Sequence, residues 1–81
     1  MKLNVKIMPK GGVLDPQGKA IENSLSQLGF KNINNVRQGK IIEIDLNENK
    51  EKSLEIVDDM CKKLLVNLII EDYEIIIDKE E

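Results

Sequence analysis

Residues 2–18 read KLNVKIMPKGGVLDPQG, and this stretch sets out the first half of the fold. Apolar and polar side chains alternate over residues 2–8, which is the period of a strand with one buried face. Pro9 ends this strand, and the glycines that follow indicate a loop. Asp15 before Pro16 is typical of a helix start, because aspartate can accept from a free amide of the first turn and proline fits the first helical position. We therefore predict a strand, a loop and a helix, in that order.

The predicted helix carries one apolar stripe. Ile21, Leu25 and Leu28 recur at spacings of four and three residues, so they share a face that we expect to lie against a core. Gly29 follows at the position where many helices end in the left-handed conformation, and Phe30 can fold back on the last turn. We therefore predict that this helix ends at Gly29.

Residues 33–37 and 40–46 predict the two strands of a β-hairpin, joined by a Gln-Gly turn. With a two-residue turn, Arg37 would face Lys40 across the strands. Two like charges in that position destabilise a hairpin unless an anion lies near them. The anion could be a carboxylate of this chain, which has 15 acidic residues, a bound phosphate or a carboxylate of a partner.

The second half of the chain predicts one more helix and one more strand. An amphipathic pattern from about Ser53 to Leu65 is typical of a helix, and its apolar positions are Leu54, Val57, Met60, Cys61 and Leu64. The helix start could be capped by Asn47, Asn49 or Ser53. Residues 68–78 alternate as a strand, with one face formed by Ile69, Tyr73, Ile75 and Ile77. The order of elements predicts an α+β, ferredoxin-like βαββαβ domain, with a four-stranded antiparallel sheet and two helices on one face.

Length and composition indicate a single globular domain over residues 1–81. A chain of 81 residues buries only about 60% of its unfolded surface, so its own core is marginal and we expect self-association. The apolar fraction of 41% and the charged fraction of 33% are typical of soluble domains. No apolar run approaches the roughly 20 residues that span a bilayer, and no signal-peptide core precedes the first strand. We therefore expect a cytoplasmic protein.

The composition also excludes several classes of function. The chain has one cysteine, Cys61, and no histidine, so it lacks a thiolate–imidazole nucleophile and a zinc site of ordinary spacing. We interpret Cys61 as a packed core thiol. The net charge of −3 does not favour phosphate contacts, and Phe30 and Tyr73, the only aromatic residues, cannot form a base-stacking platform. Nucleic-acid binding is therefore not expected.

The glycine-rich loop at residues 10–18 is the first candidate site. Free amides at a helix N-terminus could hold a phosphate or a carboxylate, but Asp15 occupies that position and would repel the anion. Val13 and Leu14 are apolar residues in a glycine-flanked loop, where such side chains more often contact a partner. A partner contact is therefore the preferred interpretation of this loop.

Two other groups of residues were considered as sites. Glu71, Asp72 and Glu74 could suggest metal binding or acid–base catalysis, but strand alternation points Glu71 away from the other two. We interpret them as solvated or edge-protecting charges. The sheet face away from the helices is predicted to be half apolar and covered by another copy or a partner, through Met8, Val36, Ile41, Ile70 and Ile76.

Three blocks of sequence resemble the PurS family over nearly the whole chain. They are GVLDPQG at residues 12–18, VRQGK at residues 36–40, and MCKKLLVN at residues 60–67 running into IEDY at residues 70–73. One departure is Leu68, where the family often has proline, and this bears only on the local backbone of that turn.

The resemblance implies a small, non-catalytic subunit of phosphoribosylformylglycinamidine synthase in de novo purine biosynthesis. That complex uses ATP, Mg and glutamine, and the resemblance implies no cofactor bound by this chain. The implied partners are a second copy in a homodimer or tetramer, the synthetase subunit PurL and the glutaminase subunit PurQ. The chain would hold the last two together for ammonia transfer.

The expected partner or self interface combines the resemblance with the unexplained loop residues. It comprises Val13, Leu14, Asp15, Pro16, Gln17, Gly18, Val36, Arg37, Gly39, Lys40, Ile41, Asn67, Ile70, Glu71, Asp72 and Tyr73. The alternative is a regulatory domain similar to ACT domains, with an amino acid bound near residues 10–18. An independent small enzyme is the third hypothesis.

Overall fold

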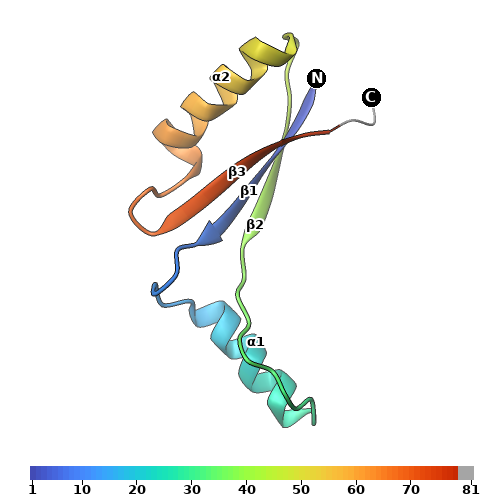
Figure 1. The fold of residues 1–81 in the computed structure, drawn as a ribbon, viewed down its shortest axis with the longest axis vertical. Coiled ribbons are helices and arrows are strands. Elements are labelled where there is room, and N and C mark those ends of the chain that lie inside the picture. Colours follow the sequence, from blue (N-terminus) through green and yellow to red (C-terminus); the bar gives the residue numbers. More distant parts are fainter. Residues whose placement is uncertain (79–81) are drawn as a thin grey trace.

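The computed structural model describes residues 1–78 and shows an α+β fold built on a thin antiparallel sheet (Figure 1). Within these residues the sheet has three strands in the order β2-β1-β3. In chain order the elements are β1 (Lys2–Pro9), α1 (Pro16–Gln27), β2 (Lys40–Asp45), α2 (Lys50–Met60), the π-helical turn η1 (Cys61–Leu65) and β3 (Glu71–Ile77). None of the helices in this part of the chain is long and apolar enough to cross a membrane.

The core lies between the central strand and the second helix. Leu3, Val5 and Ile7 alternate along β1 and are fully or almost fully buried, as the sequence predicted. Val57 of α2 and Cys61 of η1 are also completely buried and belong to the same cluster. Neighbouring strands add partly buried side chains on the same face, namely Ile42, Ile44, Tyr73, Ile75 and Ile77.

The predicted hairpin and fourth strand are not found. Residues 30–39 form no strand and lead directly into β2, which pairs with β1 so that Lys40 lies opposite Ile7 and not opposite Arg37. The physical reason is that the hydrogen-bonding groups of the supposed turn are used elsewhere. The Gln38 amide donates to Asp15, and the Arg37 side chain donates to the carbonyls of Pro9, the last residue of β1, and of Lys10.

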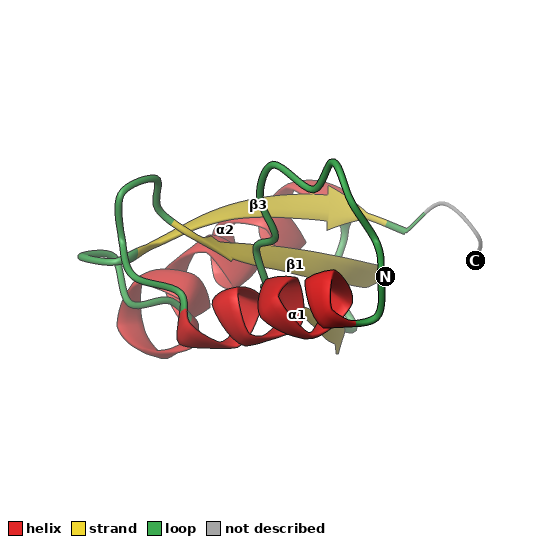
Figure 2. Ribbon diagram, turned by 90° about the horizontal axis from the view of Figure 1, so that it is seen from below, coloured by secondary structure: helices red, strands yellow, loops and turns green. Residues whose placement is uncertain are grey.

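The first helix extends away from the sheet and does not cover it. Within residues 1–78, α1 packs against none of the strands and not against α2 (Figure 1). It lies beside the returning chain, and we call residues 16–36 the arm. The expected apolar stripe is therefore largely unburied, since Leu28 is 75% exposed and Ile21 is 39% exposed. Figure 2, a view along the long axis, shows α1 below β1 and α2 passing behind the strands, and within residues 1–78 only α2 packs against a strand.

Both helix starts and the first helix end follow the predicted local chemistry. The Asp15 side chain caps α1 by accepting from the Gly18 amide. Gly29, which follows the C-cap residue Leu28 of α1, adopts a positive φ of 101°, a conformation that a side chain disfavours. Of the three possible caps of α2, the structure selects Asn49, which accepts from the Lys52 amide.

The end of the second helix differs from a regular α-helix. Val66 donates its amide to the Cys61 carbonyl at 3.1 Å, which is the i to i+5 bond of a π turn. The wider turn rotates Leu64 out to 83% exposure, although its spacing predicted a core position, and leaves Leu65 half-buried. Ile69 is also exposed at 83%, because β3 begins only at Glu71.

The sheet face opposite α2 is mixed, as expected for its strand residues. The pairing of strands places Met8, Ile41 and Ile76 on this face together with charged residues such as Lys6 and Glu74. Two residues assigned to this face, Val36 and Ile70, lie outside the strands.

A hydrogen bond joins the last strand to the second helix on the core side. The Tyr73 hydroxyl donates to Asp58 Oδ1 at 2.5 Å. This bond, then burial and the nearby negative charge raise the pKa of Tyr73 to about 12. The same bond, followed by that from Lys62, lowers the pKa of Asp58 below its usual value.

We predict that this bond can be measured directly in an alkaline titration. Tyr73 is the only tyrosine and the chain has no tryptophan, so ultraviolet absorbance of tyrosinate reports on this one group. The midpoint should lie near pH 12 and should fall towards 10 in an Asp58→Asn variant. Because the folded-state pKa of Tyr73 is raised, its contribution to stability is full below pH 10 and is lost as the pH rises through about 12. A native midpoint near 10 would contradict the bond.

Candidate interface

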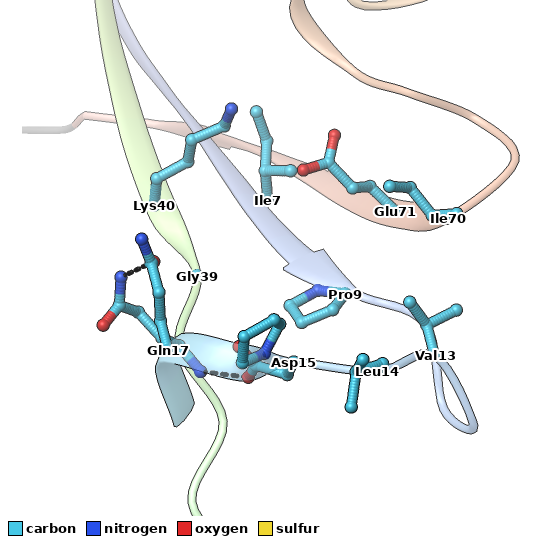
Figure 3. A pocket seen from close by; sticks show the side chains of 12 residues that line it. Ile7, Pro9, Val13, Leu14, Asp15, Gln17, Gly39, Lys40, Ile70 and Glu71 are labelled. Atoms are coloured by element: carbon cyan, nitrogen blue, oxygen red, sulfur yellow. Dashed lines mark hydrogen bonds between the residues drawn. The ribbon is translucent and has the colours of Figure 1, made fainter. Parts of the chain in front are cut away.

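The separate sequence blocks meet around one hollow at the end of the sheet. The hollow has a volume of about 460 Å³ and lies between the end of β1, the loop before α1, the start of β2 and the start of β3 (Figure 3). The predicted interface residues that line it are Val13, Leu14, Asp15, Pro16, Gln17, Gly39, Lys40, Ile70 and Glu71. Ile7, Pro9 and Gln38 complete the lining, and none of the three was among the predicted interface residues. Their strand and turn positions give no sign of it, because only the fold brings them together.

The remaining predicted interface residues lie elsewhere. Gly18, Val36 and Arg37 lie at the base of α1, where Gly18 approaches the Val36 carbonyl. Ile41 is on the sheet face opposite α2 and is 67% exposed. The last group, Asn67, Asp72 and Tyr73, lies in or next to β3, where each makes a hydrogen bond within the chain.

The rim of the hollow carries an unusually exposed apolar residue. Leu14 is 81% exposed and Val13 beside it is partly buried. Figure 3 shows both side chains on the loop that borders the hollow, with Ile70 across from them on the chain leading into β3. Apolar side chains held in the open at a concave edge are typical of a protein contact.

The polar wall of the hollow is organised by Asp15. One carboxylate oxygen accepts from the Gly18 amide at 3.0 Å, and the other accepts from the Gln38 amide at 2.8 Å. These two backbone hydrogen bonds, more than the neighbouring Arg37 charge, lower the pKa of Asp15. The Gln38 side chain also donates to the Gln17 side chain.

Arg37 finds its anion within the chain. Its Nε lies 3.6 Å from Asp15 Oδ2, so the answering group is this carboxylate, one of the three possibilities that the sequence left open. A terminal nitrogen of the same guanidinium donates to the Pro9 carbonyl at 3.3 Å and to the Lys10 carbonyl at 3.0 Å. The Nε atom itself is buried and makes no hydrogen bond among the described residues.

The acidic residues near β3 are engaged in structural contacts. Asp72 pairs with Lys10 at 2.6 Å, and Glu71 accepts from the Asn67 amide at 2.8 Å. Within residues 1–78 no group of three or more carboxylate or thiol side chains could hold a metal ion. Burial raises the pKa of the Cys61 thiol, which keeps it protonated in the core.

The turn that contains Leu68 is held by its neighbours. Asn67 Oδ1 accepts from the Ile69 amide at 3.1 Å, and the Asn67 carbonyl accepts from the Glu71 amide at 2.8 Å. Leu68 itself is half exposed, so the turn forms without a proline at this position.

Comparison with known proteins gives a consistent result over the full length. A family model described as "PurS: Phosphoribosylformylglycinamidine (FGAM) synthase" matches residues 2–79. The PurS subunit of phosphoribosylformylglycinamidine synthase from Methanocaldococcus jannaschii is 48% identical over 81 residues, covering 99% of this chain and 98% of the relative. The crystal structure of M. jannaschii PurS superimposes with a TM-score of 0.87 at 49% identity, over 99% of this chain and 98% of that one.

A further match is a chain in the structure of PurLQS from Thermotoga maritima. It has a TM-score of 0.76 and 37% identity, and the match covers 91% of this chain and 92% of that one. The family model and these relatives agree in sequence, in length and in fold. The chain therefore belongs to the PurS family of phosphoribosylformylglycinamidine synthase subunits.

Proposed function

We propose that this chain is the small, non-catalytic subunit of phosphoribosylformylglycinamidine synthase, acting in de novo purine biosynthesis in the cytoplasm. It holds the glutaminase subunit PurQ beside the synthetase subunit PurL, so that ammonia released from glutamine reaches the ATP-dependent reaction. The observation that carries this proposal is the likeness, over nearly the whole chain, to a chain in a PurLQS structure. The test is reconstitution of the activity from glutamine and from free ammonia, with and without this chain.

The geometry of the hollow supports a contact surface more than a reaction centre. Its apolar rim residue Leu14 is open to a partner, whereas its carboxylates Asp15 and Glu71 already accept backbone hydrogen bonds. Lys40 lines the hollow and supplies a cation to which a carboxylate of a partner subunit could pair. We therefore assign ATP, Mg and glutamine to the other subunits and no catalytic group to this one.

The alternative of an amino-acid-binding regulatory domain is weaker on this geometry. An amino acid ligand would direct its carboxylate to the free amides at the start of α1. There the Asp15 side chain already accepts from the Gly18 amide and from the Gln38 amide. The ligand would therefore meet a negative charge at the position where it needs donors.

We also propose that the chain forms a homodimer, because a single copy exposes too much surface. Its radius of gyration is 16.0 Å, against about 12 Å for a compact domain of this length. Its accessible surface is 6126 Å², about 1,200 Å² more than a compact chain of 9.2 kDa exposes. The excess is comparable to the roughly 800 Å² that each partner buries in a standard interface. Exposed apolar residues of the arm, Ile21 and Leu28 among them, are available to be covered.

The expected result is a mass of at least twice 9.2 kDa for the isolated chain at tens of micromolar. Light scattering coupled to gel filtration measures this mass directly. A Leu28→Asp variant places a charge on the arm and should shift the equilibrium towards monomer, whereas Leu64→Asp, which changes an equally open leucine outside the arm, should not. A monomer mass for the unmodified chain would contradict the proposed homodimer. The exposed residues of the arm would then be covered only by the other subunits of the complex.

A further inference from the structure

The arm is joined to the rest of the molecule at one small junction. Because α1 packs on none of the described strands and not on α2, no apolar interface sets the angle between arm and sheet. The chain crosses between them twice, once at residues 10–15 and once at residues 36–39 (Figure 1). Any interaction within one copy that sets the direction of the arm must therefore lie where these two crossings meet.

Asp15 and Arg37 connect both crossings to the end of the central strand. Asp15 accepts one hydrogen bond from α1 and one from the returning chain, through the amides of Gly18 and Gln38. Arg37, on the returning chain, donates to the carbonyls of Pro9 and Lys10. The two side chains lie 3.6 Å apart and are mostly shielded, with exposed fractions of 12% for Asp15 and 27% for Arg37. One charged pair thus bridges three segments of backbone.

Close packing at the junction leaves little freedom for another arrangement. A Cβ atom on Gly18 would lie 2.4 Å from Asp15 Oδ2 and 2.5 Å from the Val36 carbonyl oxygen. The returning chain is therefore in direct contact with the first turn of α1. Hydrogen bonds to a charged group contribute more than neutral ones and fix direction as well as distance.

We propose that Asp15 and Arg37 are positioning residues that form a latch, which fixes the direction of the arm relative to the sheet. The latch presents the arm and the hollow to partners in one arrangement, so that binding does not have to order them. This explains why residues 12–18 and residues 36–40 carry a carboxylate and a guanidinium that face each other. The consequence for assembly rests on the proposed function, but the latch itself does not.

The test compares arm and sheet by residual dipolar couplings of backbone amides in the Leu28→Asp background, at a concentration where the chain is a monomer, so that a second copy does not hold the arm. With Asp15 and Arg37 unchanged in that background, one alignment tensor should fit both parts. In Arg37→Met and Asp15→Asn, the couplings of α1 should fall to about half or less, since an arm that samples several directions averages them, while those of β1 and β3 stay unchanged. Arg37→Met leaves the helix cap intact. If Asp15→Asn frays the start of α1, the result for Arg37→Met therefore decides whether the latch exists. Asp59→Asn and Lys63→Met, which break an exposed ion pair at 3.0 Å between α2 and η1, are the matched controls.

A second readout separates the latch from a direct contact with a partner. Arg37→Met and Asp15→Asn should each weaken binding to the other two subunits by about tenfold. The double variant should bind no more than about twofold more weakly than either single variant, because both changes break the same latch. Retention of a single tensor by Arg37→Met and Asp15→Asn would overturn the latch, whether or not binding falls. Loosening of the arm supports the latch even where the other subunits fail to bind, and that failure would count against the proposed function alone.

Discussion

Leaving this chain out of a reconstituted phosphoribosylformylglycinamidine synthase should lower the glutamine-dependent rate by about 10²-fold or more and the ammonia-dependent rate by no more than about twofold. Ammonia added at high concentration reaches the synthetase from solution. Ammonia from glutamine must pass from one active site to another, so it depends on the two subunits being held together. On the proposed function, the subunit supplies proximity and forms or breaks no bond itself. Rates with each nitrogen source, at saturating ATP and substrate, measure the two effects separately.

A single substitution should reproduce part of this loss. Leu14→Asp places a charge on the exposed rim of the hollow and should reduce the glutamine-dependent rate selectively, because a charge is costly to bury in a contact. Leu64→Asp is the control, since Leu64 is similarly exposed, at 83% against 81%, but lies on η1 away from the hollow. Circular dichroism should show that both variants keep their helices.

For the first prediction, an equal loss of the glutamine-dependent and ammonia-dependent activities when this chain is left out would mean that the chain supports the synthetase chemistry directly.

Gly39→Ala should lower the free energy of unfolding by about 1–3 kcal/mol, although it adds one methyl group. A Cβ at this position would lie 2.4 Å from the Ile7 carbonyl oxygen and 2.2 Å from Met8 Sδ. The methionine side chain can move, but the carbonyl belongs to the central strand, so the start of β2 has to shift. For a domain of this size the melting temperature should fall by about 4–8 °C for each kcal/mol.

Gly11→Ala is the matched control for this prediction. A Cβ at Gly11 would meet no atom within 4 Å, and Gly11 does not adopt the left-handed conformation. The substitution should therefore be neutral or raise stability by about 0.4–1 kcal/mol, by restricting the unfolded chain. Thermal unfolding of both variants at one fixed protein concentration, which an associating chain requires, makes the comparison. Equal melting temperatures for Gly39→Ala and Gly11→Ala would contradict the prediction and show that the end of β1 can shift at little cost in free energy.

Local sequence patterns were sufficient to predict most of the strands and helices. The alternation around Val5 predicted a buried strand. Asp15 and Asn49 cap helix starts through their side chains, and Gly29 follows a helix end with the positive φ that glycine permits. These features depend on neighbours within a few residues, so a sequence can reveal them. The family could also be inferred from sequence, because its motifs are contiguous blocks in a fixed order.

The prediction of a hairpin was wrong because of a contact with a distant part of the sequence. Its turn was inferred from a Gln-Gly pair between two runs of residues, but the Gln38 amide bonds to Asp15, 23 residues earlier in the chain. Leu64 was assigned to the core on α-helical spacing, and a π turn closed by Val66 rotates it outwards. In both cases a hydrogen bond that the pattern does not encode changed the geometry.

The sequence by itself determined both helices and the strands other than the supposed one at residues 33–37, the buried face of β1, the absence of histidine chemistry and the membership of a family. Only the tertiary structure decided that α1 leaves the sheet as an arm, that three separate blocks enclose one hollow, and that Asp15 is the anion that answers Arg37. The physical reason is range. Side-chain periodicity and capping act over a few residues, whereas the arm, the hollow and the ion pair depend on contacts between residues more than 20 positions apart, which the pattern of either segment alone does not specify.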